Sequence, residues 1–178
     1  MKNHHRRYRF VPQALVATLT MIASLGLFAQ PVQAWTTSGY FKNWATGKCL
    51  DSNGSAVYEN PCQVGSNVYQ KWVATSTGAT ENGLAVITLK HAQSGKFLVL
   101  QRTAWNTYLG LNNNDSISET RLTVSGGGDW QNVTFWHRYT DASHQAICLD
   151  SVSPNGPYAW AGNPNCNFGF NQTWRRLQ

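Results

Sequence analysis

Short runs of β-branched and aromatic residues recur along residues 35–178 and alternate with turn-forming residues. Three such runs are Gly39–Asn43, Val86–Lys90 and Val133–His137. This composition is typical of half-buried β-strands. Clusters of Asp, Asn and Gly, such as Asp51–Gly54 and Asn112–Asp115, separate the runs and favour tight turns. No long stretch of this part carries a helical period, so the pattern predicts an all-β fold.

The strand pattern belongs to a larger repeat. Residues 47–51 read Gly-Lys-Cys-Leu-Asp and are followed by Gln-Lys-Trp at 70–72, while residues 146–150 read Ala-Ile-Cys-Leu-Asp and are followed by Gln-Thr-Trp at 172–174. A degenerate copy lies between them, where Phe97 replaces the Cys. One copy therefore takes roughly fifty residues, and such periodicity indicates stacked copies of one supersecondary unit.

Each copy has room for about four short strands. Three copies predict a closed, threefold architecture, which must bury one large side chain per copy at its centre. The residues at the equivalent positions are Trp72, Leu122 and Trp174. We expect these three side chains to pack together in the core.

Residues 1–34 have the composition of a targeting segment. A basic start containing Arg6 and Arg7 precedes an apolar run, Ala14–Ala29, and the small-residue cleavage pattern Val32–Ala34. This organisation predicts a signal peptide over residues 1–34 and a secreted domain over residues 35–178. An uncleaved anchor is the alternative, but the apolar run is short for a membrane span, so no membrane insertion is expected.

Charge is concentrated in that segment. Of the fourteen Lys and Arg residues in the chain, four lie in residues 1–34, which leaves ten against eight Asp and Glu in residues 35–178. A near-neutral domain lacks the clustered basic face that nucleic acids or anionic membranes require. The sequence therefore predicts no nucleic-acid partner.

The four cysteines are expected to form two disulfides, because the chain is predicted to be secreted. Three pairings are conceivable, and the repeat favours pairing within copies, Cys49 with Cys62 and Cys148 with Cys166. Each bridge is expected to stabilise the fold by roughly 3 kcal/mol. A zinc site would need close Cys-x-x-Cys pairs, which this sequence lacks, so no metal site is predicted.

The two Cys-Leu-Asp segments, the paired cysteines and the two Gln-x-Trp segments resemble the ricin B-chain-type lectin family, over nearly all of residues 35–178. The resemblance implies a β-trefoil fold and carbohydrate binding. In such lectins the Asp of Cys-Leu-Asp, an aromatic residue on the third strand of a repeat and an Asn before Gln-x-Trp form the sugar site. These groups suit a sugar, which has a face of C–H bonds and an edge of hydroxyls.

Mapped onto this chain, the family pattern is most complete in the third copy. Asp150 and Asn171 match, Gln172 is expected to hold Asp150 in place, and Trp160 is the predicted aromatic platform, with Tyr158 as its rival. Trp160 is aligned with Tyr58 because an Asn-Pro pair and a Cys follow each of them.

The other two copies match less well. Copy one keeps Asp51, Gln70 and Tyr58 but has Tyr69 in place of the Asn, and a phenol cannot replace an amide. Copy two has Val99 in place of the Asp and lacks Gln-x-Trp. The sequence predicts one complete site, one altered site and one copy with a structural role only.

No catalytic residues are predicted. The histidines of residues 35–178 are dispersed, there is no Gly-x-Ser-x-Gly nucleophile motif, and no pair of carboxylates is marked out. His137, within a strand-like run, is interpreted as a packed or surface residue. The chain is therefore not expected to be an enzyme, and no cofactor is expected.

These observations predict a secreted module that binds a glycan or polysaccharide through shallow sites. Two other classes remain open. One is a cell-binding subunit that acts with a partner toxin or enzyme subunit. The other is a β-trefoil protease inhibitor, which would present a basic residue such as Lys42 or Arg102 on an exposed loop.

Overall fold

Twelve strands and three short 3₁₀ helices make up the part of the chain that the computed structural model describes, residues 34–102, 107–138, 146–152, 156–160 and 166–178. The chain divides into two units, Met1–Gln30 and Pro31–Gln178, and the description below concerns the second. The predicted signal segment lies almost wholly outside the described residues. None of the described residues belongs to a helix that is long and apolar enough to cross a membrane.

Each copy of the repeat supplies four strands and one 3₁₀ helix. Copy one contains β1 (Thr36–Asn43), β2 (Cys49–Ser52), β3 (Val57–Asn60), η1 (Val68–Gln70) and β4 (Lys71–Glu81). Copy two contains β5 (Leu84–His91), β6 (Phe97–Arg102), β7 (Thr107–Asn112), η2 (Ser118–Thr120) and β8 (Leu122–Gly126). Copy three contains β9 (Val133–Arg138), β10 (Ala146–Val152), β11 (Gly156–Trp160), η3 (Phe170–Gln172) and β12 (Trp174–Leu177).

The first and fourth strands of the three copies form a closed ring. Antiparallel pairing runs from β1 to β4, β5, β8, β9 and β12, and β12 pairs back with β1. Closure leaves these six strands without a free edge along the ring. The predicted all-β fold with three repeats is thereby confirmed.

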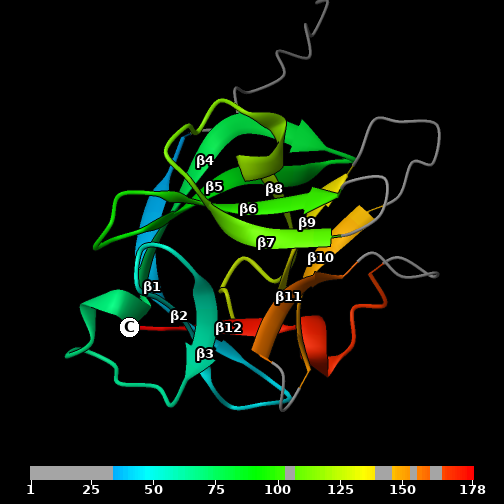
Figure 1. Cartoon of the computed structure of the whole chain (residues 1–178). Coiled ribbons are helices and arrows are strands. Elements are labelled where there is room, and N and C mark those ends of the chain that lie inside the picture. Colours follow the sequence, from blue (N-terminus) through cyan, green and yellow to red (C-terminus); the bar gives the residue numbers. More distant parts are fainter. Residues whose placement is uncertain (1–33, 103–106, 139–145, 153–155, 161–165) are drawn as a thin grey trace, which may run out of the picture. The chain divides into compact units, whose positions relative to one another are not determined.

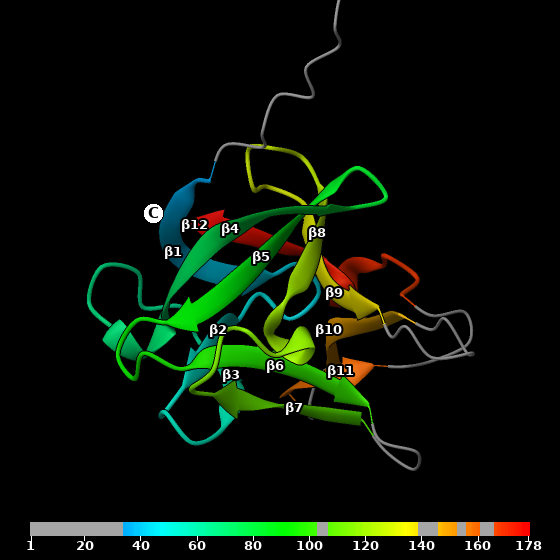
Figure 2. The same cartoon turned by 90° about the horizontal axis from the view of Figure 1, so that it is seen from above.

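The second and third strands of each copy form a hairpin: β2 with β3, β6 with β7, and β10 with β11. The outer strands β3, β7 and β11 contact one another, so the three hairpins cap one end of the ring. Figure 1 labels all six hairpin strands, and Figure 2 shows β3, β7 and β11 on the side of the domain away from β1, β4 and β12. Ring and cap together form the predicted β-trefoil.

The core lies inside the ring and beneath the cap. Trp72, Leu122 and Trp174 are fully buried and belong to one hydrophobic cluster, as the repeat predicts. The indole nitrogens of Trp72 and Trp174 donate to the backbone oxygens of Leu50 and Leu149, at 3.0 and 3.2 Å. Each tryptophan therefore packs in the core and also anchors its own hairpin.

A buried polar side chain near the end of the first strand of each copy ties neighbouring copies together. Asn43 donates from Nδ2 to the backbone oxygen of Asn171 (2.8 Å), and His91 Nε2 lies 3.0 Å from the backbone oxygen of Tyr69. His137 Nδ1 lies 3.1 Å from the backbone oxygen of Arg121. His91 and His137 therefore have structural positions, in line with the interpretation of His137 as a packed residue.

The disulfides follow the repeat. Cys49 is bonded to Cys62 and Cys148 to Cys166, which is the pairing predicted from the matching positions of the two copies. Each bridge joins the start of a hairpin to the loop that leads into the 3₁₀ helix of the same copy. The hairpin and the helix are thus held in a fixed relation, which is what positions the candidate sites.

Candidate functional site

The third copy places Asp150 on β10 next to Gln172 of η3. Asp150 is 5% exposed, and its Oδ2 accepts a hydrogen bond from Gln172 Nε2 at 2.8 Å. Gln172 Oε1 in turn accepts from the backbone N–H of Phe168 at 3.0 Å. Gln172 thus makes the contact expected of it, because its amide fixes both the carboxylate and the loop before η3.

The hairpin register identifies the residue opposite the carboxylate. Asp51 faces Tyr58 across β2 and β3, and Asp150 faces Tyr158 across β10 and β11. Trp160 faces Cys148 instead, and the residue opposite Cys49 is Asn60. The alignment of Trp160 with Tyr58 is therefore wrong by two residues, and Tyr158 is the counterpart of Tyr58. The side chains of Tyr158 and Trp160 lie outside the described part.

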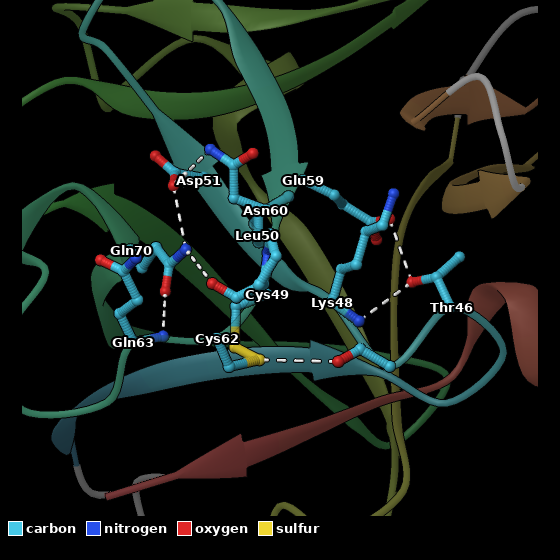
Figure 3. Close-up of a disulfide and its surroundings, with 12 residues drawn as sticks. Thr46, Lys48, Cys49, Leu50, Asp51, Glu59, Asn60, Cys62, Gln63 and Gln70 are labelled. Carbon is cyan, nitrogen blue, oxygen red and sulfur yellow. Dashed lines mark hydrogen bonds between the residues drawn. A yellow bond between two sulfur atoms is a disulfide. The ribbon is translucent and has the colours of Figure 1, made fainter.

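The first copy reproduces the third around Asp51. Asp51 is 1% exposed, and its Oδ2 accepts from Gln70 Nε2 (3.0 Å) and from Asn60 Nδ2 (3.1 Å). Gln70 also donates to the backbone oxygen of Pro61 and accepts from the backbone N–H of Gln63 at 2.8 Å. Figure 3 shows this network beside the Cys49–Cys62 bridge, with Gln70 between Asp51 and the Gln63 loop.

The environment of Asp51 suits hydroxyl donors. Its Oδ1 is buried and accepts no hydrogen bond of ordinary geometry from a described residue, so a small shift of the neighbouring side chains is what would open this oxygen to a hydroxyl. Tyr58 lies opposite Asp51 in the hairpin, and burial together with the negative charge of Asp51 raises the pKa of its phenol. Tyr58 is half-buried in β3, where the sequence predicts an aromatic platform.

The second copy retains the backbone of the site without its chemistry. Val99 occupies the position of the carboxylate, and Gly110 lies opposite it on β7. Thr120, the last residue of η2, takes the position of the glutamine and donates to the backbone oxygen of Ile117 at 2.8 Å. With an aliphatic side chain in place of the carboxylate, this copy keeps the packing of the repeat but none of its polar anchors.

Asn171 and Tyr69 are equivalent, since each is the middle residue of its 3₁₀ helix. Both side chains are exposed. Tyr69 stacks on the His91 ring at a centroid distance of 6.5 Å, which is an aromatic contact that an amide could not make. Asn171 instead lines a depression of about 460 Å³ together with Trp44 and Phe170. Sequence analysis missed Trp44, which lies in the turn after β1.

Titratable groups outside these sites are arranged for packing. Burial lowers the pKa of His91 and of His137 and raises the pKa of Glu59. Glu59 Oε2 accepts from the hydroxyl of Thr46 at 3.1 Å. Lys42, considered above as an inhibitory residue, lies within β1 and pairs with Arg175 of β12 instead of lying on a loop. Among the described residues, no three His, Cys, Asp or Glu side chains gather as a metal site would require.

The arrangement can recognise a neutral polar ligand. A fixed carboxylate accepts hydrogen bonds from hydroxyls, and an exposed amide both donates and accepts. In copy one, Tyr58 opposite Asp51 provides an apolar ring with a polar tip. These groups can therefore bind the hydroxyls of a ligand.

Comparison with known proteins shows likeness at the level of structure. No family model matches this chain, and no curated protein does. The agglutinin of Rhizoctonia solani aligns with a TM-score of 0.59 and 18% identity, over 83% of this chain and 99% of the agglutinin. The designed threefold-symmetric protein ThreeFoil aligns with a TM-score of 0.54 and 17% identity, over 79% of this chain and 98% of ThreeFoil.

Two longer proteins also align over 79% of this chain. One is an endo-β-galactosidase from Clostridium perfringens that releases GlcNAcα1-4Gal, with a TM-score of 0.56 and 16% identity. The other is the hemolytic lectin CEL-III, with a TM-score of 0.54 and 20% identity. This chain spans only about a third of each, 32% and 30%. At such identities the likeness shows the fold alone, and that fold is the β-trefoil.

Proposed function

We propose that this protein is a secreted carbohydrate-binding protein and that its principal site is the third copy, around Asp150, Asn171 and Gln172. The observation that carries the proposal is the Asp150 carboxylate held in place by Gln172 at 2.8 Å, with the exposed Asn171 directly before Gln172 in η3. Hydroxyl groups of a sugar would donate to the carboxylate and bond with the amide. The two disulfides support a secreted location, because such bridges persist in oxidising compartments.

The uneven copies support a binding role. A carboxylate needed only for folding would be expected in all three copies, yet Val99 replaces it in copy two, where the hairpin is still formed. The fold therefore does not require an acid at this position. Two structural neighbours, the Rhizoctonia solani agglutinin and CEL-III, are named as an agglutinin and a lectin, which agrees with a glycan ligand.

A glycan array with the purified secreted protein tests the proposal. The matched variant is Asp150→Asn, which keeps an oxygen for Gln172 but removes the charge that attracts hydroxyl donors. We expect the wild type to bind a set of neutral glycans and Asp150→Asn to lose most of that signal. Unchanged binding by a folded Asp150→Asn would show that the third copy is not the principal site.

A cell-binding subunit is the second candidate. It is favoured because the endo-β-galactosidase and CEL-III match this chain over only about a third of their own length, so comparable units occur beside other parts of longer proteins. In that case glycan binding would direct a partner toxin or enzyme to its target. Co-purification from culture medium, with and without competing glycan, distinguishes a partnered protein from one that acts alone.

A further inference from the structure

Three exposed aromatic side chains meet at the junction between copy one and copy three. Trp44 lies in the turn between β1 and β2, Phe168 lies in the loop that leads into η3, and Phe170 is the first residue of η3. They are 44%, 54% and 75% exposed, respectively. Two adjoining depressions of about 460 and 390 Å³ share Trp44, Gly169 and Phe170 in their walls. Volumes of this size are within the range of small-molecule sites.

Trp44 is held rigidly. Its backbone N–H donates to the backbone oxygen of Thr173 at 3.0 Å, and its indole Nε1 donates to the backbone oxygen of Gln131 at 3.1 Å. The guanidinium of Arg175 lies 5.3 Å from the ring centroid. A ring fixed in this way loses little conformational freedom when a ligand stacks on it.

The facing loop is also fixed in an unusual conformation. Phe168 has a φ of 54°, which a bulky residue rarely adopts, and the preceding Cys166 has a φ of 45°. The Cys148–Cys166 bridge and the hydrogen bond from Phe168 to Gln172 hold this backbone in place. Backbone strain of this kind persists only where the surroundings enforce it, and it is common at ligand sites.

Amides complete the depressions. Asn167 and Asn171 line the larger one and Asn132 lines the smaller one. The side-chain amide of Asn171 makes no hydrogen bond to any described residue, so both its donor and acceptor groups are available. Neither depression has an ionisable residue in its wall. The ligand class that fits is therefore neutral, with an apolar face and hydroxyl edges.

The repeat itself shows that Trp44 is not needed for the turn. The equivalent turn of copy two has the same backbone bonds: Trp44 donates to the backbone oxygen of Thr173, and Ala92 donates to that of Lys71. His91 and Lys96 pair in the second turn just as Asn43 and Lys48 pair in the first. Alanine thus forms the turn equally well, so the turn itself does not require the exposed indole.

We infer that this junction, which we call the Trp44 platform and define by Trp44, Phe168, Phe170, Asn167 and Asn171, is a second sugar-binding subsite. A pyranose ring stacks its C–H face on the aromatic side chains while Asn171 bonds with its hydroxyls. The inference rests on the proposed function for its ligand class, but it does not use Asp150. Because Asn171 precedes Gln172, the subsite and the Asp150 site adjoin, and one polysaccharide chain can occupy both.

NMR titration of the ¹⁵N-labelled protein tests the inference directly. The probes are the methyl glycosides of galactose, xylose and mannose, with glycerol as the polyol control. The indole N–H signal of Trp44 is assigned as the one that disappears in Trp44→Ala. This variant is expected to fold, because Ala92 occupies the equivalent position in the turn of copy two. We expect one of the sugars, and not glycerol, to shift the Trp44 indole and Asn171 amide signals, and Asp150→Asn to leave the shift of the Trp44 indole intact.

Binding to immobilised galactan, xylan and mannan gives a second readout. We expect Trp44→Ala to weaken binding to the recognised polymer by about tenfold, the value of one aromatic contact. Tyr108→Ala, which removes an exposed aromatic of copy two outside these depressions, is the control and should bind as wild type does.

The two proposals fail separately. If Asp150→Asn loses sugar binding while Trp44→Ala binds as the wild type does, the platform alone is wrong. If Trp44→Ala loses binding while Asp150→Asn binds as the wild type does, the principal site alone is wrong. If no sugar moves the Trp44 signal while an apolar dye such as ANS does, the platform is an apolar docking surface and the inference is wrong.

Discussion

At the scale of single residues, the same position in the repeat carries different chemistry in each copy. Asp51 and Asp150 are buried carboxylates that accept from Gln70 and Gln172, while Val99 is their counterpart in copy two. A buried carboxylate with an amide partner is costly to disrupt, because the amide would lose its acceptor. Function and packing therefore have to be separated by substitutions that keep the hydrogen bond.

Trp174 and Asp150 provide that separation. We expect Trp174→Ala to lower the free energy of unfolding by roughly 3–5 kcal/mol, because it removes a fully buried aromatic side chain. Asp150→Asn should change it by about 1 kcal/mol or less while removing sugar binding. Urea unfolding and titration with a recognised glycoside measure the two effects. A strongly destabilised Asp150→Asn would assign the carboxylate to folding and not to ligand recognition.

His91 makes the stability depend on pH. Burial lowers its pKa in the folded state, although the nearby Asp51 acts in the opposite direction. The unfolded chain therefore binds a proton at about pH 6.5, where folded His91 is still neutral. It follows that the stabilising contribution of neutral His91 is complete above about pH 6.5 and is lost as the pH falls towards its folded pKa.

His91→Asn is the matched variant, because Asn43 makes the equivalent contact in copy one. We expect the wild type to lose more stability than His91→Asn between pH 7.5 and pH 5.5, as measured by urea unfolding. Glu59, whose pKa is raised by burial, favours the folded state as the pH falls. Because the wild type and the variant both contain Glu59, its contribution cancels when their stabilities are subtracted. Parallel pH profiles would rule out a role for His91 in this dependence.

At the scale of elements, each disulfide connects a hairpin to the loop that feeds its 3₁₀ helix. Removing the Cys148–Cys166 bridge by double substitution to alanine should cost roughly 3 kcal/mol of stability. It should also weaken sugar binding, because the loop of Phe168 and the position of Gln172 depend on it. Unfolding and glycoside titration of both double variants provide the test.

The Cys49–Cys62 pair is the matched control for that experiment. Its removal should cost a comparable free energy but leave binding by the third copy unchanged, because it constrains only copy one. Equal loss of affinity in the two double variants would mean that the bridges act on overall stability and not on the local site.

Sequence analysis succeeded where a residue type has a fixed place in the repeat. The Cys-Leu-Asp and Gln-x-Trp segments predicted the core tryptophans and the disulfides, because each repeat must bury the same side chains against the shared core. It misaligned Trp160 with Tyr58, because the cysteines of copy three are 18 residues apart and those of copy one are 13 apart. The additional residues of copy three shift the Asn-Pro pair along the sequence relative to Asp150. The strand pairing is unaffected, because Asp150 pairs with Tyr158 just as Asp51 pairs with Tyr58.

The Trp44 platform could not be predicted for a different reason. Trp44 and Phe170 come from opposite ends of the repeat array and meet only because β1 pairs with β12. Within copy one nothing distinguishes Trp44 from an ordinary turn residue. A surface between two copies forms only when the ring closes. Comparing one repeat with another along the sequence does not show which residues of different copies will meet there.

At the scale of the whole domain, the differences among the three copies determine how many sugar molecules one domain binds. Among the three carboxylate positions, we expect a soluble monosaccharide to bind only that of the third copy, in addition to the Trp44 platform, and to bind weakly, since a shallow polar site gains little over water. Polysaccharide should bind more tightly if it spans several sites, without any new contact. Isothermal titration with monomeric and polymeric sugar measures both.

Asp51→Asn and Asp150→Asn separate the contributions of the copies in that titration. Asp150→Asn should remove monosaccharide binding at the principal site and leave only that of the Trp44 platform, whereas Asp51→Asn should reduce only the binding of polymer. An equal loss of monosaccharide binding in Asp51→Asn and in Asp150→Asn would show that Tyr69 does not impair copy one. Retention of monomer binding in Asp150→Asn and its loss in Asp51→Asn would reverse the ranking of the copies.

The pairing of β1 with β12 also governs when the domain can fold. Residues 40–43 find their partners at residues 174–177, so the barrel stays open until the last of these residues has left the ribosome. Contacts between such distant residues form slowly, because a long loop must close before they stabilise anything. The ring therefore closes late in synthesis, which would favour the export that the proposed secretion requires, because an open chain threads through a narrow channel more easily than a closed barrel.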